Sequence, residues 1–561
     1  MFKEAVYHES DSTYAFAVDE NTLCIKLKAK KDDLKRVILC YADRYEPKAE
    51  LTIFEKEMER AFSDDLFDYY ETEIKLTFNR VCYYFKLIDD KQSLIYSQQR
   101  FLQEPPKERN KFFFFPYICK ADIYKTFDWW REAVFYQIFV DRFNKEEIDE
   151  NWFDEPTNNR LFGGNLKGII HKLDYISNLG VNAIYLTPIF ESPSCHKYDT
   201  IDYYKIDSAF GDEKIFKELV DECHKRGIKV ILDAVFNHTS DKFFAFKDIL
   251  ENGKKSRYYD WYFFKDEDKY ETFAHVKCMP KLNTTNEEVV NYLLGIAKYY
   301  IEKFDIDGWR LDVANEIDHA FWRKFRETVK KAKEDAIIIG EVWDGAESYL
   351  RGDQYDSTMN YPFMYAALDY FAKGKITLLE FDYYMNNLYA RYRKDIRYNL
   401  LNLLDSHDTS RFLFECDENI EKLKMAVFYM MTTIGIPMIF YGDEAGLSGA
   451  NDPDCRITMD FEYINEDLFD FYRKMIQIRK SSKALMYGEY RTLKVSDSLY
   501  VYKRFIDDEE IICIFNNGSQ KEEFEIEGTN AFDLISYEEI NIKNNSMTIK
   551  PNEKLVLKIN R

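Results

Sequence analysis

The amino-acid sequence predicts an α/β fold, a (β/α)8 TIM barrel with one β-sandwich before it and another after it. In the middle of the chain, eight short apolar segments alternate with helical patterns, which is typical of parallel strands separated by helices. The two flanking regions instead show short apolar runs separated by polar turns, which is typical of β-sandwiches. We therefore expect three domains, at residues 1–121, 122–482 and 483–561.

The N-terminal region is predicted to be a β-sandwich because its apolar residues alternate or run together over strand-sized lengths. Segments 22–28, 37–41 and 81–87 show this pattern most clearly. A cluster of proline and charged residues at 104–110 precedes the change to the strand-and-helix pattern. After residue 482 short strand patterns return, at 500–504, 510–515 and 522–526, and predict the C-terminal sandwich.

The barrel region contains eight candidate parallel strands with helical patterns between them. The clearest helices are expected at 215–226 and 287–304. A longer stretch, about 240–288, leaves room for an inserted subdomain after the third strand. The candidate strands lie at 133–140, 183–190, 229–236, 306–313, 336–342, 357–362, 400–405 and 437–441.

Composition excludes some classes of partner. The chain of 561 residues has 78 basic and 100 acidic residues, a net charge of −22, and no sustained basic run. Nucleic acid and anionic membrane surfaces would be repelled, so we expect neither as a partner and expect a neutral ligand instead. The 43 tyrosines and 45 phenylalanines fit a large core, and aromatic faces also stack on the apolar faces of sugars.

Three features predict a cytoplasmic protein. The first ten residues carry acids where a secretory signal needs an apolar stretch. The most apolar run, 425–441, is interrupted by Thr432, Gly435 and Pro437, so it predicts a buried helix that leads into a strand. Ten scattered cysteines without CxxC spacing fit a reducing compartment and argue against a disulfide framework or a structural zinc site.

Four short segments at predicted strand ends carry acids, histidines and an arginine. Because a parallel barrel brings all its strand ends to one face, residues far apart in sequence are expected to converge there. Any single strand-end histidine could be a structural cap, but the recurrence of such residues at four sites predicts an active site. The segments are Asp233-Ala-Val-Phe-Asn-His238, Gly308-Trp-Arg-Leu-Asp312, Gly340-Glu341-Val-Trp343 and Ser406-His407-Asp408.

Asp312 and Glu341 suit the two roles needed to cleave an acetal, which are carboxylate nucleophile and proton donor. Arg310 stands two residues before Asp312 on the same strand face, so it should keep Asp312 ionised. Glu341 follows the apolar stretch 336–340, so burial should favour its protonated form. His238, His407 and Asp408 would supply hydrogen bonds to sugar hydroxyls.

These segments resemble the signature regions of the α-amylase family, glycoside hydrolase family 13. They look most similar to its neopullulanase, cyclomaltodextrinase and maltogenic amylase branch, through segments 196–200, 279–283, 313–316 and 451–456. Segments 5–8 and 14–27 resemble the N-terminal starch-binding-type module of that branch. The resemblance spans nearly the whole chain.

The resemblance implies a role for each matching residue. Asp312 would be the nucleophile, Glu341 the acid/base and Asp408 the third carboxylate, in a retaining double displacement with the catalytic carboxyls about 5 to 5.5 Å apart. The implied substrate-binding residues are Arg310, His238, His407 and Tyr198 at the cleaved sugar, His196 in the neighbouring loop, Asp452 and Arg456 on the non-reducing side, and Trp343, Glu316 and Phe273 on the leaving-group side.

The resemblance also bears on metal and oligomeric state. Members of this branch commonly bind calcium through a loop after the first strand and an Asp in a Gly-Gly-Asp-Leu segment, where this chain has Asn165. Loss of a charged oxygen weakens a calcium site, so we expect no required cofactor and consider bound calcium doubtful. Branch members often dimerise with the N-terminal module over the partner's barrel mouth, so we expect a homodimer.

The leading hypothesis is an intracellular retaining hydrolase of α-1,4-glucosidic bonds in cyclodextrins, maltooligosaccharides and pullulan, with some transglycosylation. A glucanotransferase or an α-1,6-active relative shares the same catalytic trio and remains an alternative. A non-catalytic glucan- or partner-binding scaffold would usually lack part of that trio, which this chain retains.

Overall fold

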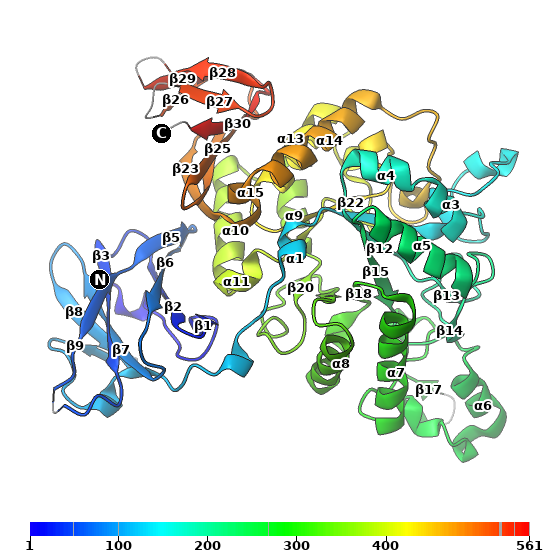
Figure 1. Ribbon diagram of the computed structural model, residues 1–561, viewed down its shortest axis with the longest axis horizontal. Coiled ribbons are helices and arrows are strands. Elements are labelled where there is room, and N and C mark those ends of the chain that lie inside the picture. Colours follow the sequence, from blue (N-terminus) through cyan, green and yellow to red (C-terminus); the bar gives the residue numbers. More distant parts are fainter. Residues whose placement is uncertain (49, 99, 267–268, 527–529, 543–544, 560–561) are drawn as a thin grey trace.

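An eight-stranded parallel sheet closes into a barrel at the centre of the computed structural model, which describes residues 1–48, 50–98, 100–266, 269–526, 530–542 and 545–559 (Figure 1). The strand order is β20-β19-β18-β15-β12-β11-β22-β21, and a parallel bridge from Met359 to Leu401 joins its two ends. The predicted barrel class and all eight strands are confirmed. The strands are β11 (Phe135–Ile138), β12 (Ala183–Leu186), β15 (Lys229–Ala234), β18 (Gly308–Leu311), β19 (Ile337–Gly340), β20 (Ser357–Thr358), β21 (Leu401–Asn402) and β22 (Ile436–Phe440).

Most barrel strands are shorter than their apolar patterns in the sequence. The stretch 306–313, for example, forms a strand only over Gly308–Leu311. Burial at the barrel rim extends the apolar pattern into the loops, where the backbone leaves the ladder: Val313 lies in the left-handed region at φ 45°. Asp312 and Glu341 therefore lie in the loops directly after β18 and β19.

Amphipathic helices cover the outside of the barrel. In α7 (Glu287–Phe304) the buried Val289, Leu293, Ile296 and Tyr300 recur at helical spacing, and the Asn286 side chain caps the first turn. The predicted helix 287–304 is confirmed, and α5 (Glu213–Lys225) begins two residues before the predicted 215. The others are α1 (Asp128–Glu132), α2 (Val140–Phe143), α3 (Leu166–His171), α4 (Leu173–Leu179), α8 (His319–Ala332), α9 (Tyr361–Ala367), α10 (Leu378–Arg391), α11 (Lys394–Arg397), α12 (Phe412–Glu415), α13 (Ile420–Thr432), α14 (Glu466–Ser481) and α15 (Lys483–Tyr487).

The apolar run 425–441 forms the buried helix α13 followed by strand β22, as predicted. Among the residues described, no helix combines the length and apolar character needed to cross a membrane.

Two antiparallel sheets form the N-terminal sandwich, with orders β1-β2-β6-β5 and β4-β3-β7-β8-β9, and β10 added beside β7. Alternate residues of the central strands, such as Leu23, Ile25 and Leu27, point into one apolar core. The strands are β1 (Ala15–Asp19), β2 (Thr22–Lys30), β3 (Arg36–Asp43), β4 (Phe54–Glu57), β5 (Glu59–Ser63), β6 (Phe67–Lys75), β7 (Val81–Ile88), β8 (Ser93–Ser97), β9 (Arg100–Leu102) and β10 (Phe113–Phe115).

The C-terminal sandwich likewise has its own core, which includes Leu499, Val501 and Ile514. A sheet of order β23-β24-β25-β30-β27-β28 packs with the pair β26-β29. The strands are β23 (Glu489–Val495), β24 (Leu499–Ile506), β25 (Glu509–Asn516), β26 (Glu522–Glu525), β27 (Asn530–Asp533), β28 (Glu538–Asn541), β29 (Ser546–Ile549) and β30 (Lys554–Ile559).

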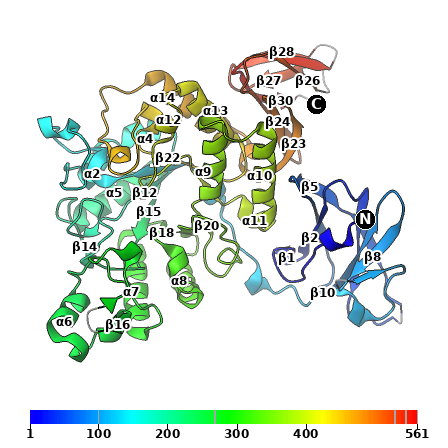
Figure 2. The same ribbon diagram turned by 180° about the vertical axis from the view of Figure 1, so that it is seen from behind.

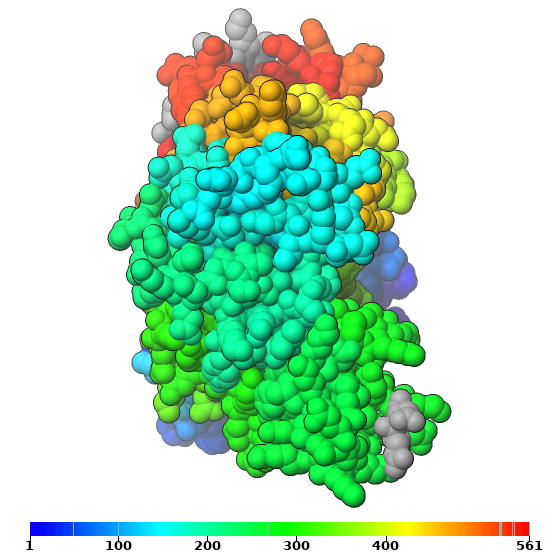
Figure 3. Space-filling model, turned by 90° about the vertical axis from the view of Figure 1, so that its right-hand side faces the viewer, coloured from blue at the N-terminus to red at the C-terminus, as the bar shows by residue number. Residues whose placement is uncertain are grey.

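The segment after β15 forms a small layer beyond the barrel strand ends, as expected for 240–288. It contains α6 (Phe244–Asn252), β16 (Phe264–Asp266) and β17 (Lys269–Tyr270), and a hairpin of β13 (Phe190–Glu191) and β14 (Asp202–Ile206) precedes it. Figures 1 and 2 place this layer and the N-terminal sandwich on opposite sides of the barrel. In the view of Figure 3 the green and cyan parts of the chain face the reader and the blue N-terminal sandwich lies behind.

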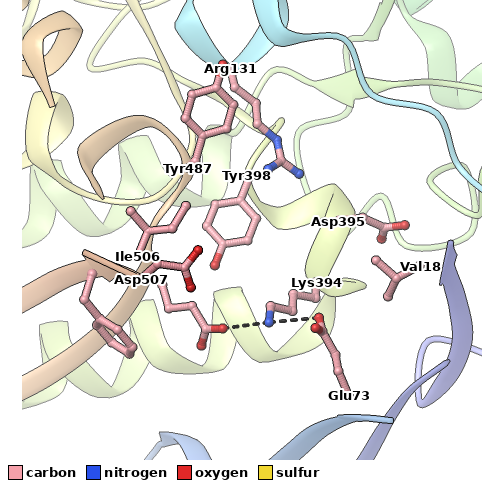
Figure 4. Close-up of a pocket in the computed structure, with 11 residues that line it drawn as sticks. Val18, Glu73, Arg131, Lys394, Asp395, Tyr398, Tyr487, Ile506 and Asp507 are labelled. Atoms are coloured by element: carbon pink, nitrogen blue, oxygen red, sulfur yellow. Dashed lines mark hydrogen bonds and ion pairs between the residues drawn. The ribbon is translucent and has the colours of Figure 1, made fainter. Parts of the chain in front are cut away.

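Polar contacts hold the N-terminal sandwich to the back of its own barrel. The buried Lys26 ammonium donates to the carbonyls of Ala390 (2.6 Å) and Tyr392 (2.9 Å) at the end of α10. Nearby, Lys394 lies between Glu73 (2.9 Å) and Glu489 (2.7 Å), which come from the two sandwiches. Lys394, Glu73 and Glu489 border a cavity of about 340 Å³ where the three domains meet (Figure 4).

Candidate active site

Arg310 is the centre of a buried cluster of three carboxylates at one end of the barrel. Its strand β18 lies between β15, which carries Asp233, and β19, which Glu341 follows. One guanidinium nitrogen donates to both carboxylate oxygens of Asp233 (3.1 Å each) and to Asp312 Oδ1 (2.8 Å). The other lies 2.9 Å from Glu341 Oε1. The predicted convergence of these strand ends is therefore present.

Arg310 does not distinguish Asp312 from Glu341, because both carboxylates contact it. Burial raises the pKa of Asp312 well above its ordinary value, the neighbouring Glu341 charge adds to this, and Arg310 opposes it. Burial also raises the pKa of Asp233 to about 6. The expectation that Arg310 keeps Asp312 ionised took no account of this crowding, in which one guanidinium serves three buried acids.

Glu341 is held by donors on both carboxylate oxygens. Its Oε2 accepts from the Val313 backbone N–H (2.8 Å) and its Oε1 from the Trp343 indole N–H (3.0 Å). Val313 is β-branched with a positive φ, a strained conformation that turns its N–H toward Glu341. Trp343 stacks on Tyr361, with ring centres 3.9 Å apart, and remains 39% exposed.

Asp408 and His407 lie in the loop after β21, on the other side of Arg310. The His407 ring is parallel to the Tyr198 ring, with centres 5.4 Å apart, and its Nε2 is 2.5 Å from the Tyr198 hydroxyl. Burial, together with the charges of Arg456 and Arg310, lowers the pKa of His407 well below its ordinary value, so the ring is neutral. Asp408 pairs with Arg456 (3.2 Å) and keeps 30% of its side chain exposed.

The remaining predicted substrate-binding residues lie around this cluster. His238 is buried, stacks on Phe273 at 4.9 Å, and burial lowers its pKa to about 3. His196 stacks near Tyr198, with ring centres 6.0 Å apart. Both histidines also contact the Tyr198 backbone: His238 Nε2 lies 3.1 Å from its carbonyl oxygen, and His196 Nδ1 accepts from its N–H (3.1 Å).

Two charged pairs lie next to the cluster. Asp452 accepts from Asn158 (2.9 Å) and pairs with Arg456 (3.0 Å). On the side of the inserted layer, Glu316 lies 3.4 Å from the Lys281 ammonium. The structure thus brings every predicted site residue into one continuous set of contacts.

Sequence reasoning did not assign some participants. Asp233 opens one of the four strand-end segments and lies on the strand next to that of Arg310, to which it hydrogen-bonds. An acid at that position is a signal that could have identified it. Gln137, which contacts His407 Nδ1 at 2.7 Å, and Tyr361, which stacks on Trp343, are ordinary core types whose role depends on the fold.

The residues expected to hold calcium do not fit that ion. Asn165 uses its Oδ1 to cap α3 through the Gly168 N–H (2.8 Å) and its Nδ2 to reach the Gly163 carbonyl (3.2 Å). Lys145 places an ammonium 2.7 Å from Asp149 Oδ2. Across the described ranges, histidine, cysteine, aspartate and glutamate form no group of three or more suited to a metal.

A parallel barrel with paired acids at its strand ends defines a glycoside hydrolase site. A family profile described as alpha amylase, catalytic domain, matches residues 137–463, and one described as alpha amylase, N-terminal ig-like domain, matches residues 1–119. The chain belongs to the α-amylase family and is a glycoside hydrolase with a cyclomaltodextrinase- and neopullulanase-like sequence.

The similarity to individual relatives covers the whole chain. A cyclomaltodextrinase of Thermoanaerobacter pseudethanolicus (strain ATCC 33223 / 39E) is 44% identical over 100% of both chains. Neopullulanase 2 of Thermoactinomyces vulgaris is 42% identical over 99% of both. A solved cyclomaltodextrinase structure superposes with a TM-score of 0.95 at 37% identity and covers 100% of each chain.

Proposed function

We propose that this protein is a retaining hydrolase that cleaves α-1,4-glucosidic bonds of cyclodextrins, maltooligosaccharides and pullulan, with some transglycosylation. The observation that carries the proposal is the placement of Asp312 and Glu341 on the two nitrogens of Arg310, with Asp408 beside them. Relatives named cyclomaltodextrinase and neopullulanase support the substrate class.

In the proposed mechanism, Glu341 protonates the glycosidic oxygen while an Asp312 oxygen attacks the anomeric carbon and forms a glycosyl ester. Glu341 then takes a proton from water, which attacks the same carbon and releases Asp312. The shared arginine and the raised pKa of Asp312 support a cluster that holds a proton in the empty site. Two inversions return the α-anomer.

We assign the sugar-binding roles by position around this pair. Tyr198 forms the platform beneath the cleaved sugar, and the neutral His407 beside it donates or accepts hydrogen bonds to hydroxyls. Asp452 and Arg456 contact sugars on the non-reducing side, with His196 and His238 completing the pocket. Trp343, Glu316 and Phe273 form the leaving-group side, and the 39% exposure of Trp343 next to Glu341 supports this.

We also propose a cytoplasmic homodimer in which the N-terminal sandwich of one subunit roofs the barrel mouth of its partner. The sandwich lies on the far side of its own barrel, so it could cover only another chain (Figure 3). A roofed cleft would admit small cyclic or short linear glucans and exclude long polymers. A Bacillus subtilis relative named intracellular maltogenic amylase supports the compartment.

A product profile on β-cyclodextrin, maltotriose, starch and pullulan tests the proposal. We expect β-cyclodextrin to be cleaved faster than starch, with a freshly formed α-configured reducing end by NMR. Panose from pullulan would support α-1,4 cleavage, whereas maltotriose would favour the α-1,6-active alternative. A β-configured product contradicts the double displacement. A monomer by light scattering contradicts the proposal that the N-terminal sandwich covers the barrel mouth of a partner subunit.

A further inference from the structure

We propose that the ammonium of Lys145 is a built-in cation that does the structural work of a calcium ion beside the barrel mouth. Its Nζ donates to Asp149 Oδ2 (2.7 Å) and to the Phe162 carbonyl (3.2 Å), and it lies 5.2 Å from the ring centre of Trp152. The Lys145 side chain is only 11% exposed. A positive charge is thus already fixed among the oxygens of this loop.

The side-chain oxygens Asp149 Oδ1 and Asn165 Oδ1 also have partners. Asp149 Oδ1 accepts from the Asn151 N–H (3.0 Å), and Asn165 directs both its polar atoms into its own turn. Calcium requires six to eight oxygens, several of them charged, and here a single carboxylate faces the ammonium. A divalent ion would have to displace both Lys145 and the cap of α3.

The aliphatic stem of Lys145 lies beside Gly163. Gly163 has φ +93°, and a Cβ on it would lie 3.5 Å from Lys145 Cδ, so the stem passes beside the space that a larger residue at 163 would enter. The charged tip contacts the Phe162 carbonyl and the Trp152 ring as well as Asp149. This distinguishes Lys145 from a surface lysine, whose ion pair contributes little.

The loop that Lys145 holds reaches the sugar-binding side of the site. Asn158, within the same loop, donates to Asp452 (2.9 Å), and its carbonyl accepts from Cys195 (3.5 Å). With a covalently attached cation, the order of this loop does not depend on free calcium. The inference concerns stability and stands whether or not the proposed substrate specificity is correct.

The first test compares melting temperatures and limited proteolysis of the full-length protein. Wild type should melt within about 1 °C of the same temperature in excess EDTA and in millimolar CaCl2. Lys145→Met keeps the apolar stem and removes the charge, so it should melt about 3 °C lower and be cut within 144–162 about fivefold faster. Lys217→Met is the matched control, because Lys217 also pairs with an aspartate four residues on, Asp221, but at a 42% exposed position on α5.

The second test asks for the converse change. The double variant Lys145→Met/Asn165→Asp removes the built-in cation and adds a carboxylate, so CaCl2 should raise its melting temperature by about 3 °C and slow loop cleavage. Wild type melting markedly lower in EDTA and restored by calcium would overturn the proposal. So would Lys145→Met behaving like Lys217→Met in both assays. If Lys145→Met does not fold, Lys145→Arg should fold and melt at the same temperature with and without calcium. The melting temperature of wild type in EDTA then decides whether the proposal holds.

Discussion

The two ends of the barrel use the same residue types in opposite ways. At the end that carries the site, Asp233, Asp312 and Glu341 share the single Arg310. At the other end, Asp307 alone accepts from Lys229 (3.0 Å), Lys333 (2.8 Å), His224 (2.7 Å) and the Val230 N–H (2.9 Å).

The difference shows in the ionisation of the acids. Burial alone would raise the pKa of Asp307, but hydrogen bonds from His224 and Lys333 outweigh it and hold that pKa below its ordinary value. At the active end, burial and the Glu341 charge prevail over Arg310 and raise the pKa of Asp312. One end of the barrel pairs its acid with several donors and stabilises the fold, whereas the other holds three acids on one arginine and so retains a proton that acid/base chemistry can use.

The largest effect should follow substitution at the active end. Asp312→Asn or Glu341→Gln should lower turnover of β-cyclodextrin by about four orders of magnitude or more, because each removes one of two groups that act as a unit. The melting temperature should not fall, since one of several crowded carboxylates is lost. Reducing-sugar release and thermal unfolding measure the two effects, and a variant with near-wild-type turnover would refute the assignment.

Substitution of Asp307, at the other end of the barrel, should lower stability and leave turnover nearly unchanged. Asp307→Asn removes a buried carboxylate from three partly exposed donors, Lys229, Lys333 and His224, and should cost about 3 kcal/mol of unfolding free energy, with turnover of the folded enzyme nearly unchanged. Asp305→Asn is the control, since Asp305 also pairs with Lys333 but is 60% exposed and should cost less than about 1 kcal/mol. Loss of turnover without loss of stability in Asp307→Asn would contradict the comparison.

The pH dependence separates the two ends further. Because the pKa of Asp307 is depressed, its stabilisation is present above the unfolded value of about 4 and is lost as pH falls through the folded pKa. The Asp307→Asn deficit should therefore stay constant from pH 7 to about 5 and shrink only below about 4. Asp312 has a raised pKa, so any stability gained by Asp312→Asn should be greatest at neutral pH and shrink as pH falls.

A smaller loss of activity should follow removal of the hydrogen bond that Trp343 donates to Glu341. Trp343→Phe keeps an aromatic ring on Tyr361 but removes the indole N–H that donates to Glu341. Loss of one hydrogen bond to a charged group is worth about a tenfold fall in kcat/KM. Tyr361→Phe keeps the stack and serves as the control. If Trp343→Phe turns over as fast as Tyr361→Phe, the stacking rather than the N–H positions Glu341.

Much of this could be predicted from the sequence because it depends on periodicity and strand order. The eight barrel strands and helix α7 follow from apolar spacing, and a parallel barrel then brings Asp312, Glu341 and Asp408 to one face. The sharing of Arg310 could not be predicted, because it depends on side-chain conformation: β15, β18 and β19 are consecutive barrel strands, but the rotamers decide which acids the guanidinium reaches. Nor could the positive φ of Val313 be predicted, since β-branched residues rarely adopt it.

The smallest effect should arise where the three domains meet, again at the end of the barrel away from the site. Burial alone would lower the pKa of Lys394, but Glu489 and Glu73, together with Tyr398, raise it above its ordinary value, so the ammonium is firmly charged there (Figure 4). Its 21% exposure is intermediate between buried Asp307 and a surface pair, so Lys394→Met should cost about 1 to 2 kcal/mol. Because Glu73 and Glu489 belong to the two sandwiches, the loss of stability should appear as earlier melting of the sandwiches, with turnover unchanged.

Differential scanning calorimetry measures this earlier melting of the sandwiches, with Lys394→Arg as the charge-conserving control. A fall in turnover at constant melting temperature would mean that this junction communicates with the site, and the two ends of the barrel would then not be independent.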